Sequence, residues 1–101
     1  MGSFFYDRRR TDFDDRTLAH LRHVIVAKLR RGESFELTWN LPVEAGSGRV
    51  SVWLHPSVPL KFTFSSGVRH QLNRAWIEAL AANSFSTTGL HLLPEPAPQS
   101  D

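Results

Sequence analysis

The chain contains no cysteine among its 101 residues. This absence excludes disulfide bonds, thiolate ligands for a metal and a cysteine nucleophile. The chain also lacks an apolar run of the roughly 20 residues that span a bilayer, so we expect no membrane partner. The charges of the N-terminal segment MGSFFYDRRR follow its apolar residues, which is the reverse of a signal peptide. We therefore expect a cytoplasmic protein.

Motifs that indicate catalysis or cofactor binding are also absent. The sequence has no Gly-x-Ser-x-Gly elbow, no Walker loop and no dinucleotide fingerprint. A Gly-Ser-Gly segment at residues 46–48 does not predict a phosphate cradle, because no helix follows it to supply an N-terminus. We therefore expect no cofactor, and we predict that the protein is not an enzyme.

Charge is small in total but unevenly distributed. The formal net charge is +2, and residues 1–31 carry eight Lys or Arg against four Asp or Glu, whereas the remainder carries four against six. A basic first third makes a nucleic-acid-binding surface a hypothesis to test, although it does not establish one.

One long amphipathic helix is predicted from residue 14 to about residue 31. Asp14 suits the N-cap, and Phe13 and Leu18 have the spacing of a hydrophobic staple. Gly32 suits the left-handed residue that ends many helices. One side of this helix is apolar and consists of Leu18, Leu21, Ile25 and Leu29, which we call the leucine stripe.

Three segments alternate between apolar and polar residues, at 34–41, 49–55 and 60–64. Short loops join them, which predicts an antiparallel meander with one face toward solvent. Short strands are also expected at 3–7 and 8–13, a second helix at 72–83 and a last strand at 90–93. The expected core comprises the leucine stripe together with Phe35, Leu37, Trp39, Val50, Val52, Leu54, Phe62, Phe64, Trp76 and Leu80.

These elements predict a single α+β domain over residues 1–93. It would contain an antiparallel sheet of four to six strands and two helices, in the order β(β)αβββαβ, with the longer helix packed on the aromatic side of the sheet. Residues 94–101 form a polar, proline-rich segment, which we expect to be a disordered tail.

The side of the long helix opposite the leucine stripe carries the first set of candidate site residues. This set consists of Arg16, His20, His23, Arg30 and Arg31. Three interpretations are open: a solvated helix face, a surface that contacts phosphates with help from Arg22 and residues 8–10, or a metal site. The face lacks the amide or hydroxyl side chains that read base edges. A metal held by His20 and His23 would need a third ligand, such as His55, His70 or His91, and we predict no metal.

Trp53 and His55 form the second candidate set, because both fall on the polar face of a predicted strand. An exposed Trp on such a face can be a stacking platform or a subunit contact. The alternatives are that the second helix covers this face or that another subunit covers it. We favour self-association, with the chain as a homo-oligomer such as a homodimer.

Three segments carry a resemblance: DDRTLAHLRHVIVAKLRRGESF, WLHPSVPLKF and LNRAWIEAL. With them the chain resembles a family of small uncharacterised actinobacterial proteins, whose members often carry the automatic title ATP-dependent DNA ligase. That title implies adenylation of the Lys in a Lys-x-Asp-Gly motif. Neither Lys28 nor Lys61 begins such a motif, so we expect no ligase activity.

Two functional hypotheses result. The first is a small intracellular, non-catalytic interaction module that forms homo-oligomers. The alternative is a nucleic-acid-binding accessory protein linked to DNA handling.

Overall fold

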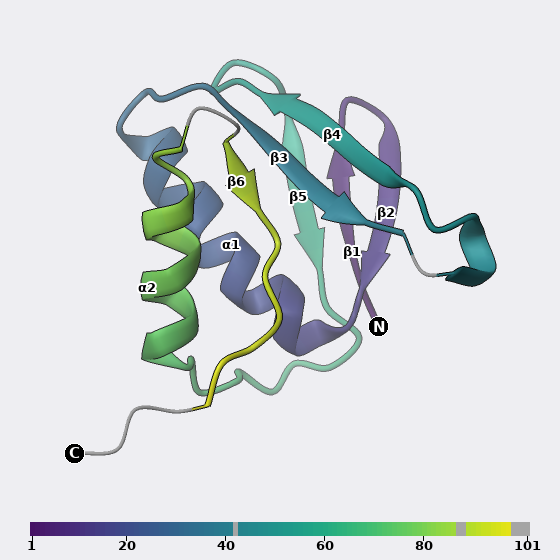
Figure 1. The fold of residues 1–101 in the computed structure, drawn as a ribbon. Coiled ribbons are helices and arrows are strands. Elements are labelled where there is room, and N and C mark those ends of the chain that lie inside the picture. Colours follow the sequence, from purple (N-terminus) through teal and green to yellow (C-terminus); the bar gives the residue numbers. More distant parts are fainter. Residues whose placement is uncertain (42, 87–88, 98–101) are drawn as a thin grey trace.

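The computed structural model describes residues 1–41, 43–86 and 89–97. In these residues the order is β1 (Gly2–Tyr6), β2 (Arg9–Phe13), α1 (Asp15–Arg30), β3 (Phe35–Asn40), a 3-10 turn (Val43–Ala45), β4 (Arg49–Leu54), β5 (Leu60–Thr63), α2 (Arg74–Asn83) and β6 (Leu90–His91) (Figure 1). The predicted α+β class, with two helices in the order ββαβββαβ, is confirmed. Neither helix combines the length and the apolar character needed to cross a membrane.

The ends of α1 are set by local chemistry, as predicted. The Asp14 carboxylate accepts a hydrogen bond from the Thr17 backbone N–H at 3.1 Å, which satisfies a free donor of the first turn. At the other end, Gly32 has a φ of 75°, and the N–H of Glu33 donates to the Lys28 carbonyl at 3.2 Å. This pairing is a Schellman motif, which closes the last turn where a side chain with a Cβ would be strained.

The strands form two three-stranded sheets, in the orders β2-β1-β5 and β4-β3-β6. Neighbouring strands are antiparallel except for β3 and β6, which are parallel. The predicted meander is therefore wrong at its third strand, because β5 pairs with β1 and not with β4. Pro56 and Pro59 bracket the turn after β4 and cannot donate to a ladder, and the Phe62 ring stacks instead on Phe4 of β1 at 5.3 Å.

Both sheets and both helices contribute to one core. Its buried apolar residues are Phe4, Phe13, Leu18, Leu21, Val24, Ile25, Phe35, Leu37, Trp39, Leu54, Trp76, Leu80 and Leu90. The Phe13 ring meets the Trp39 ring edge-on at 5.4 Å, which joins the two sheets. Phe64 was predicted to be in the core and is instead 37% exposed, because β5 ends at Thr63 and the alternation of its faces ends with it.

Helix α2 runs alongside α1 in the same direction, and β6 lies next to α2 (Figure 1). Three residues of α1, spaced by four, face α2 and are buried: His20, Val24 and Lys28. Trp76 of α2 contacts the first of them, and Ser84, which follows α2, contacts the last. The buried part of α1 is consequently wider than the leucine stripe alone.

The segment after β6 returns to α1. The sequence predicts a disordered tail from residue 94, whereas the Glu95 carboxylate pairs with the Arg16 guanidinium through two hydrogen bonds of 2.8 and 2.7 Å. Asn73 donates to Glu95 and to the Pro96 carbonyl. An ion pair and two side-chain hydrogen bonds thus attach residues 95 and 96 to α1 and to the start of α2, and the disorder of the tail stays a prediction. The rest of the predicted tail, residues 98–101, lies outside the described residues.

Candidate functional site

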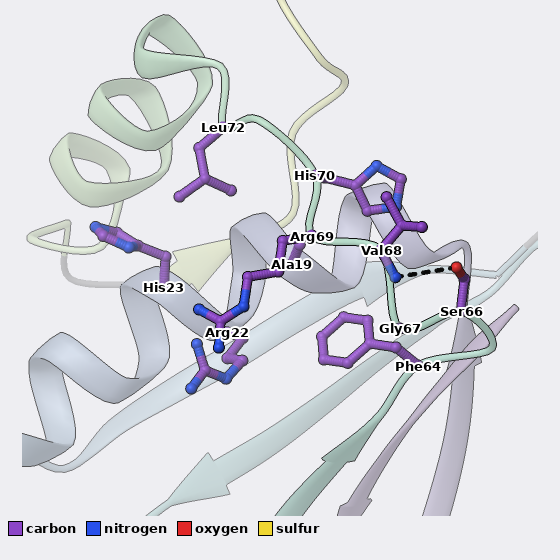
Figure 2. Close-up of a pocket in the computed structure, with 10 residues that line it drawn as sticks. All are labelled: Ala19, Arg22, His23, Phe64, Ser66, Gly67, Val68, Arg69, His70 and Leu72. Atoms are coloured by element: carbon purple, nitrogen blue, oxygen red, sulfur yellow. Dashed lines mark hydrogen bonds between the residues drawn. The ribbon is translucent and has the colours of Figure 1, made fainter.

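A pocket of about 400 Å³ lies between the exposed side of α1 and the irregular segment 64–73 that joins β5 to α2 (Figure 2). We call this segment the linker. The lining residues are Ala19, Arg22, His23, Phe64, Ser66, Gly67, Val68, Arg69, His70 and Leu72. Its volume is within the range of small-molecule binding sites. The pocket is therefore a candidate for a functional site.

Both ends of the linker are attached to α1. At the first end, Ser65 donates from its backbone N–H and its hydroxyl to the Asp15 carboxylate, the latter at 2.8 Å. These hydrogen bonds lower the pKa of Asp15. At the second end, the Asn73 N–H donates to His20 and the Arg16 guanidinium donates to the Gln71 carbonyl. The middle of the linker is therefore held over α1 as one wall of the pocket.

Arg22 of α1 and Arg69 of the linker place two positive charges in this pocket, and no acidic residue is among its lining residues. In Figure 2 the Arg69 side chain extends from the linker back toward α1. Neither guanidinium forms an ion pair with any residue that the structure describes. Two like charges brought to one place without a counter-ion repel each other. The arrangement is therefore suited to an anion that contacts both.

His23 and His70 lie toward opposite ends of the pocket (Figure 2), and each adds a ring that can donate a hydrogen bond. Apart from Ser66, the rest of the lining is apolar, and Phe64, Val68 and Leu72 present exposed side chains there. The site thus combines guanidinium groups with an aromatic ring. That combination suits a ligand with an anionic group joined to a flat or apolar part.

A family model described as "Domain of unknown function (DUF7882)" matches residues 1–95. The chain belongs to this family. Comparison with curated proteins and with solved structures gave no match. The match covers both walls of the pocket, so the site is part of the DUF7882 domain itself.

His20 was predicted on the exposed face of the long helix, and this prediction is wrong. Its side chain is completely buried, with a relative exposure of 0%. Nδ1 lies 2.7 Å from the Arg16 carbonyl oxygen, and Nε2 accepts the Asn73 backbone N–H at 2.8 Å. One partner is an acceptor and the other a donor, so the ring is neutral with its proton on Nδ1. Burial is the main cause that lowers the pKa of His20.

The physical reason is the position of α2. Its Trp76 ring lies against the His20 ring, with the centroids 4.4 Å apart. Helix α2 therefore covers a side of α1 that does not belong to the leucine stripe. We name the cluster of buried His20, Asn73 and Trp76 with the partly exposed Arg16–Glu95 ion pair the interhelical joint. A phosphate cannot reach His20 in this arrangement.

The other predicted phosphate-binding residues differ in their availability. Arg16 is bound to Glu95, and the guanidinium lowers the pKa of that carboxyl group to about 2, with a further contribution from Asn73. Arg31 pairs with Glu33 at 2.6 Å. Arg30 is exposed, and His23 is exposed and lines the pocket. The structure thus brings together neither the full predicted set nor, within the described residues, a group of three metal-binding side chains.

Trp53 lies on β4 and His55 just after it, and both are exposed in the single chain, so coverage by another subunit stays a prediction. Trp53 is 61% exposed, so α2 does not cover it. The His55 ring is bound to its own turn, because its Nδ1 accepts hydrogen bonds from the backbone N–H and the hydroxyl of Ser57.

Arg69 and Phe64 were not predicted as site residues, and His70 was considered only as a candidate third ligand for a metal. A signal was present: the segment Ser-Ser-Gly-Val-Arg-His-Gln between β5 and α2 has no strand or helix pattern, yet it contains two cationic or titratable side chains. Loops held by a rigid scaffold commonly carry binding residues.

Proposed function

We propose that the protein is a non-catalytic binding module for a ligand that carries a phosphate group next to an aromatic or apolar part. The observation that carries this proposal is that Arg22 and Arg69, from two different elements, line one pocket with no carboxylate among its described lining residues.

Guanidinium groups support phosphate as the anion. Each can donate two parallel hydrogen bonds to phosphate oxygens, and such charge-assisted bonds are stronger than neutral ones. The Phe64 ring beside them supports a base as the attached part, because bases stack on aromatic side chains. A free nucleotide and an unpaired nucleotide of a nucleic acid share this chemistry, so both sources are consistent with the site.

A long duplex is less well supported than a single nucleotide unit. Binding to a duplex depends on neutralising many phosphates at once. Arg10, Arg16 and Arg31 are already engaged by Asp12, Glu95 and Glu33 respectively. The arginines that line the pocket are Arg22 and Arg69.

Ligase activity is not part of the proposal. Lys28 is 4% exposed, donates to Glu33 and Ser84, and lies between the rings of Phe35 and Phe85. A lysine held in this way is not available as a nucleophile toward a nucleotide. An intracellular location is part of the proposal, and the absence of cysteine supports it.

Calorimetric titration at low salt tests the proposal. The probes are a nucleoside 5′-monophosphate, the same nucleoside without phosphate, inorganic phosphate and a short single-stranded oligonucleotide. We expect saturable binding of the monophosphate and no binding of the nucleoside. An oligonucleotide that binds much more tightly than the monophosphate would identify nucleic acid as the source, and equal affinities would identify the free nucleotide.

Arg22→Gln and Arg69→Gln should each weaken the binding by about ten-fold or more, because each removes a charge-assisted contact. Arg74→Gln is the matched control, since Arg74 is exposed, pairs only with Glu78 and does not line the pocket. Absence of saturable binding by every phosphate-bearing probe, or an equal loss in the control variant, would contradict the proposal.

A further inference from the structure

The outer strands of the two sheets differ in how well their free edges are protected. Strand β6 has two residues and is covered by α2. Strand β5 has four residues with Lys61 among them, and β2 carries Arg9, Arg10 and Asp12. Short length and charge are the usual means by which a free edge avoids pairing with another chain. Strand β4 has six residues and carries Trp53, which is 61% exposed.

The outward face of β4 has a simple order. Arg49, Ser51 and Trp53 alternate along it, and they lie opposite Asn40, Thr38 and Glu36 of β3 respectively. All three β4 residues are exposed. In the described part of the chain, β4 is hydrogen-bonded to β3 alone, so its other edge is open.

We propose that the open edge of β4 pairs with β4 of a second copy of this chain, antiparallel and centred on Ser51. In this register Ser51 faces Ser51 of the second copy, and Arg49 faces Trp53 of the second copy. The two three-stranded β4-β3-β6 sheets then become one six-stranded sheet, in the order β6-β3-β4-β4-β3-β6.

Complementarity supports this register. An Arg guanidinium beside a Trp ring gains a cation–π contact, and the two-fold symmetry makes this contact twice. Glu36 lies on the far side of Trp53, so each cross-strand row would run from Arg49 of one chain, over the Trp, to Glu36 of the other. Shifting the centre by one residue to Val52 would place Trp53 opposite Ser51 and lose this pairing. The strand is therefore self-complementary in the one register that matches charge with ring.

The interface is separate from the anion pocket. None of the pocket-lining residues belongs to β4, so failure of the ligand-binding proposal leaves this one intact, and the reverse also holds.

Sedimentation equilibrium of the full chain tests for the dimer. We expect a concentration-dependent monomer–dimer equilibrium, in which Trp53→Ala raises the dissociation constant about ten-fold or more. Val43→Ala is the matched control, because Val43 is also an exposed apolar residue, at 81%, and lies outside β4. A wild-type chain that stays monomeric at the highest attainable concentration, or a dimer insensitive to Trp53→Ala, would overturn the proposal. The first outcome would leave the edge to a strand of another protein.

The absence of native cysteine allows a test of the register. Paired antiparallel residues have Cα atoms about 4.5–5.5 Å apart, which is within the reach of a disulfide. Ser51→Cys should therefore form a disulfide-linked dimer under mild oxidation, which non-reducing electrophoresis would show. Thr63→Cys, exposed on the short strand β5, is the control and should remain largely unlinked. Equal cross-linking of the two variants would refute the Ser51-centred register.

Discussion

His20 and His23 lie three residues apart on α1, in surroundings that differ completely. His20 has no exposed surface, and both of its ring nitrogens have backbone partners. His23 is exposed and lines a pocket that contains two unpaired guanidiniums. The first belongs to the interhelical joint and the second to the candidate anion site.

This contrast shows that one side of α1 contributes to packing and another side lines the candidate site. In the joint, each cation has a carboxylate and each buried polar atom has a partner, so the polar groups stabilise the packing of α1 against α2. In the pocket, two like charges line one surface and form no ion pair with any described residue, so we expect them to contribute little to the stability of the fold. Groups of that kind are typical of sites where function has been kept at some cost in stability.

Replacement of His20 should have the largest effect. His20→Ala removes a completely buried ring, leaves a cavity beside Trp76 and leaves the Asn73 N–H without a partner, so we expect a loss of about 3 kcal/mol in the free energy of unfolding. His23→Ala, three residues away, should change it by less than about 0.5 kcal/mol. Urea denaturation of the two variants measures both values. Similar losses in the two would remove the distinction between joint and pocket.

The pH dependence of stability should come next in size, and it separates two groups of the joint. Burial lowers the pKa of His20 in the folded chain below its usual 6.5. The unfolded chain therefore binds a proton more readily, and stability is complete above pH 6.5 and decreases as the pH falls below it. Protonation would also direct a ring N–H at the Asn73 N–H.

Glu95 acts in a lower window. Its folded pKa is about 2 against the usual 4.5, so its contribution is complete above pH 4.5 and is lost as the pH falls toward 2. Thermal melts across this range should show both declines in the wild type. Glu95→Gln should make the lower decline smaller, because Asp15 and Glu33, whose pKa values are also lowered, still contribute to it, and should leave the upper decline in place. An unchanged profile between pH 6.5 and 5 would contradict the role assigned to His20.

The smallest effect is expected in the pocket. Arg22→Gln and Arg69→Gln should each change the free energy of unfolding by less than about 0.5 kcal/mol, and in the stabilising direction, because each removes one of two like charges that line the same pocket. The same urea measurement checks this. A clear loss of stability in either variant would show that these arginines support the fold, which would weaken the case for a ligand site.

Much of the fold was predictable because its signals are local. Asp14 and Gly32 mark the ends of α1, and the alternation around Trp39 and Trp53 marks β3 and β4. The site was less predictable. Val24, four residues after His20, was a sign that α1 has a second buried side, but a single apolar residue outside the leucine stripe does not show which element covers it.

Pairings between distant segments left no comparable mark. Nothing in the sequence near Phe62 indicates that β5 pairs with β1, where Phe62 stacks on Phe4, rather than with β4, the preceding strand in the sequence. In the same way, Arg69 lines the pocket only because the Asp15–Ser65 and His20–Asn73 contacts hold the linker against α1.

The sequence by itself determined the elements, the ends of α1 and most of the core, because capping, turn chemistry and hydrophobic periodicity act over a few residues. The tertiary structure alone decided which strands pair, that His20 is buried while His23 is open, and that Arg22 and Arg69 share a pocket. Those outcomes depend on where α2 and the linker lie across α1, and that placement is set by contacts between residues that are tens of positions apart.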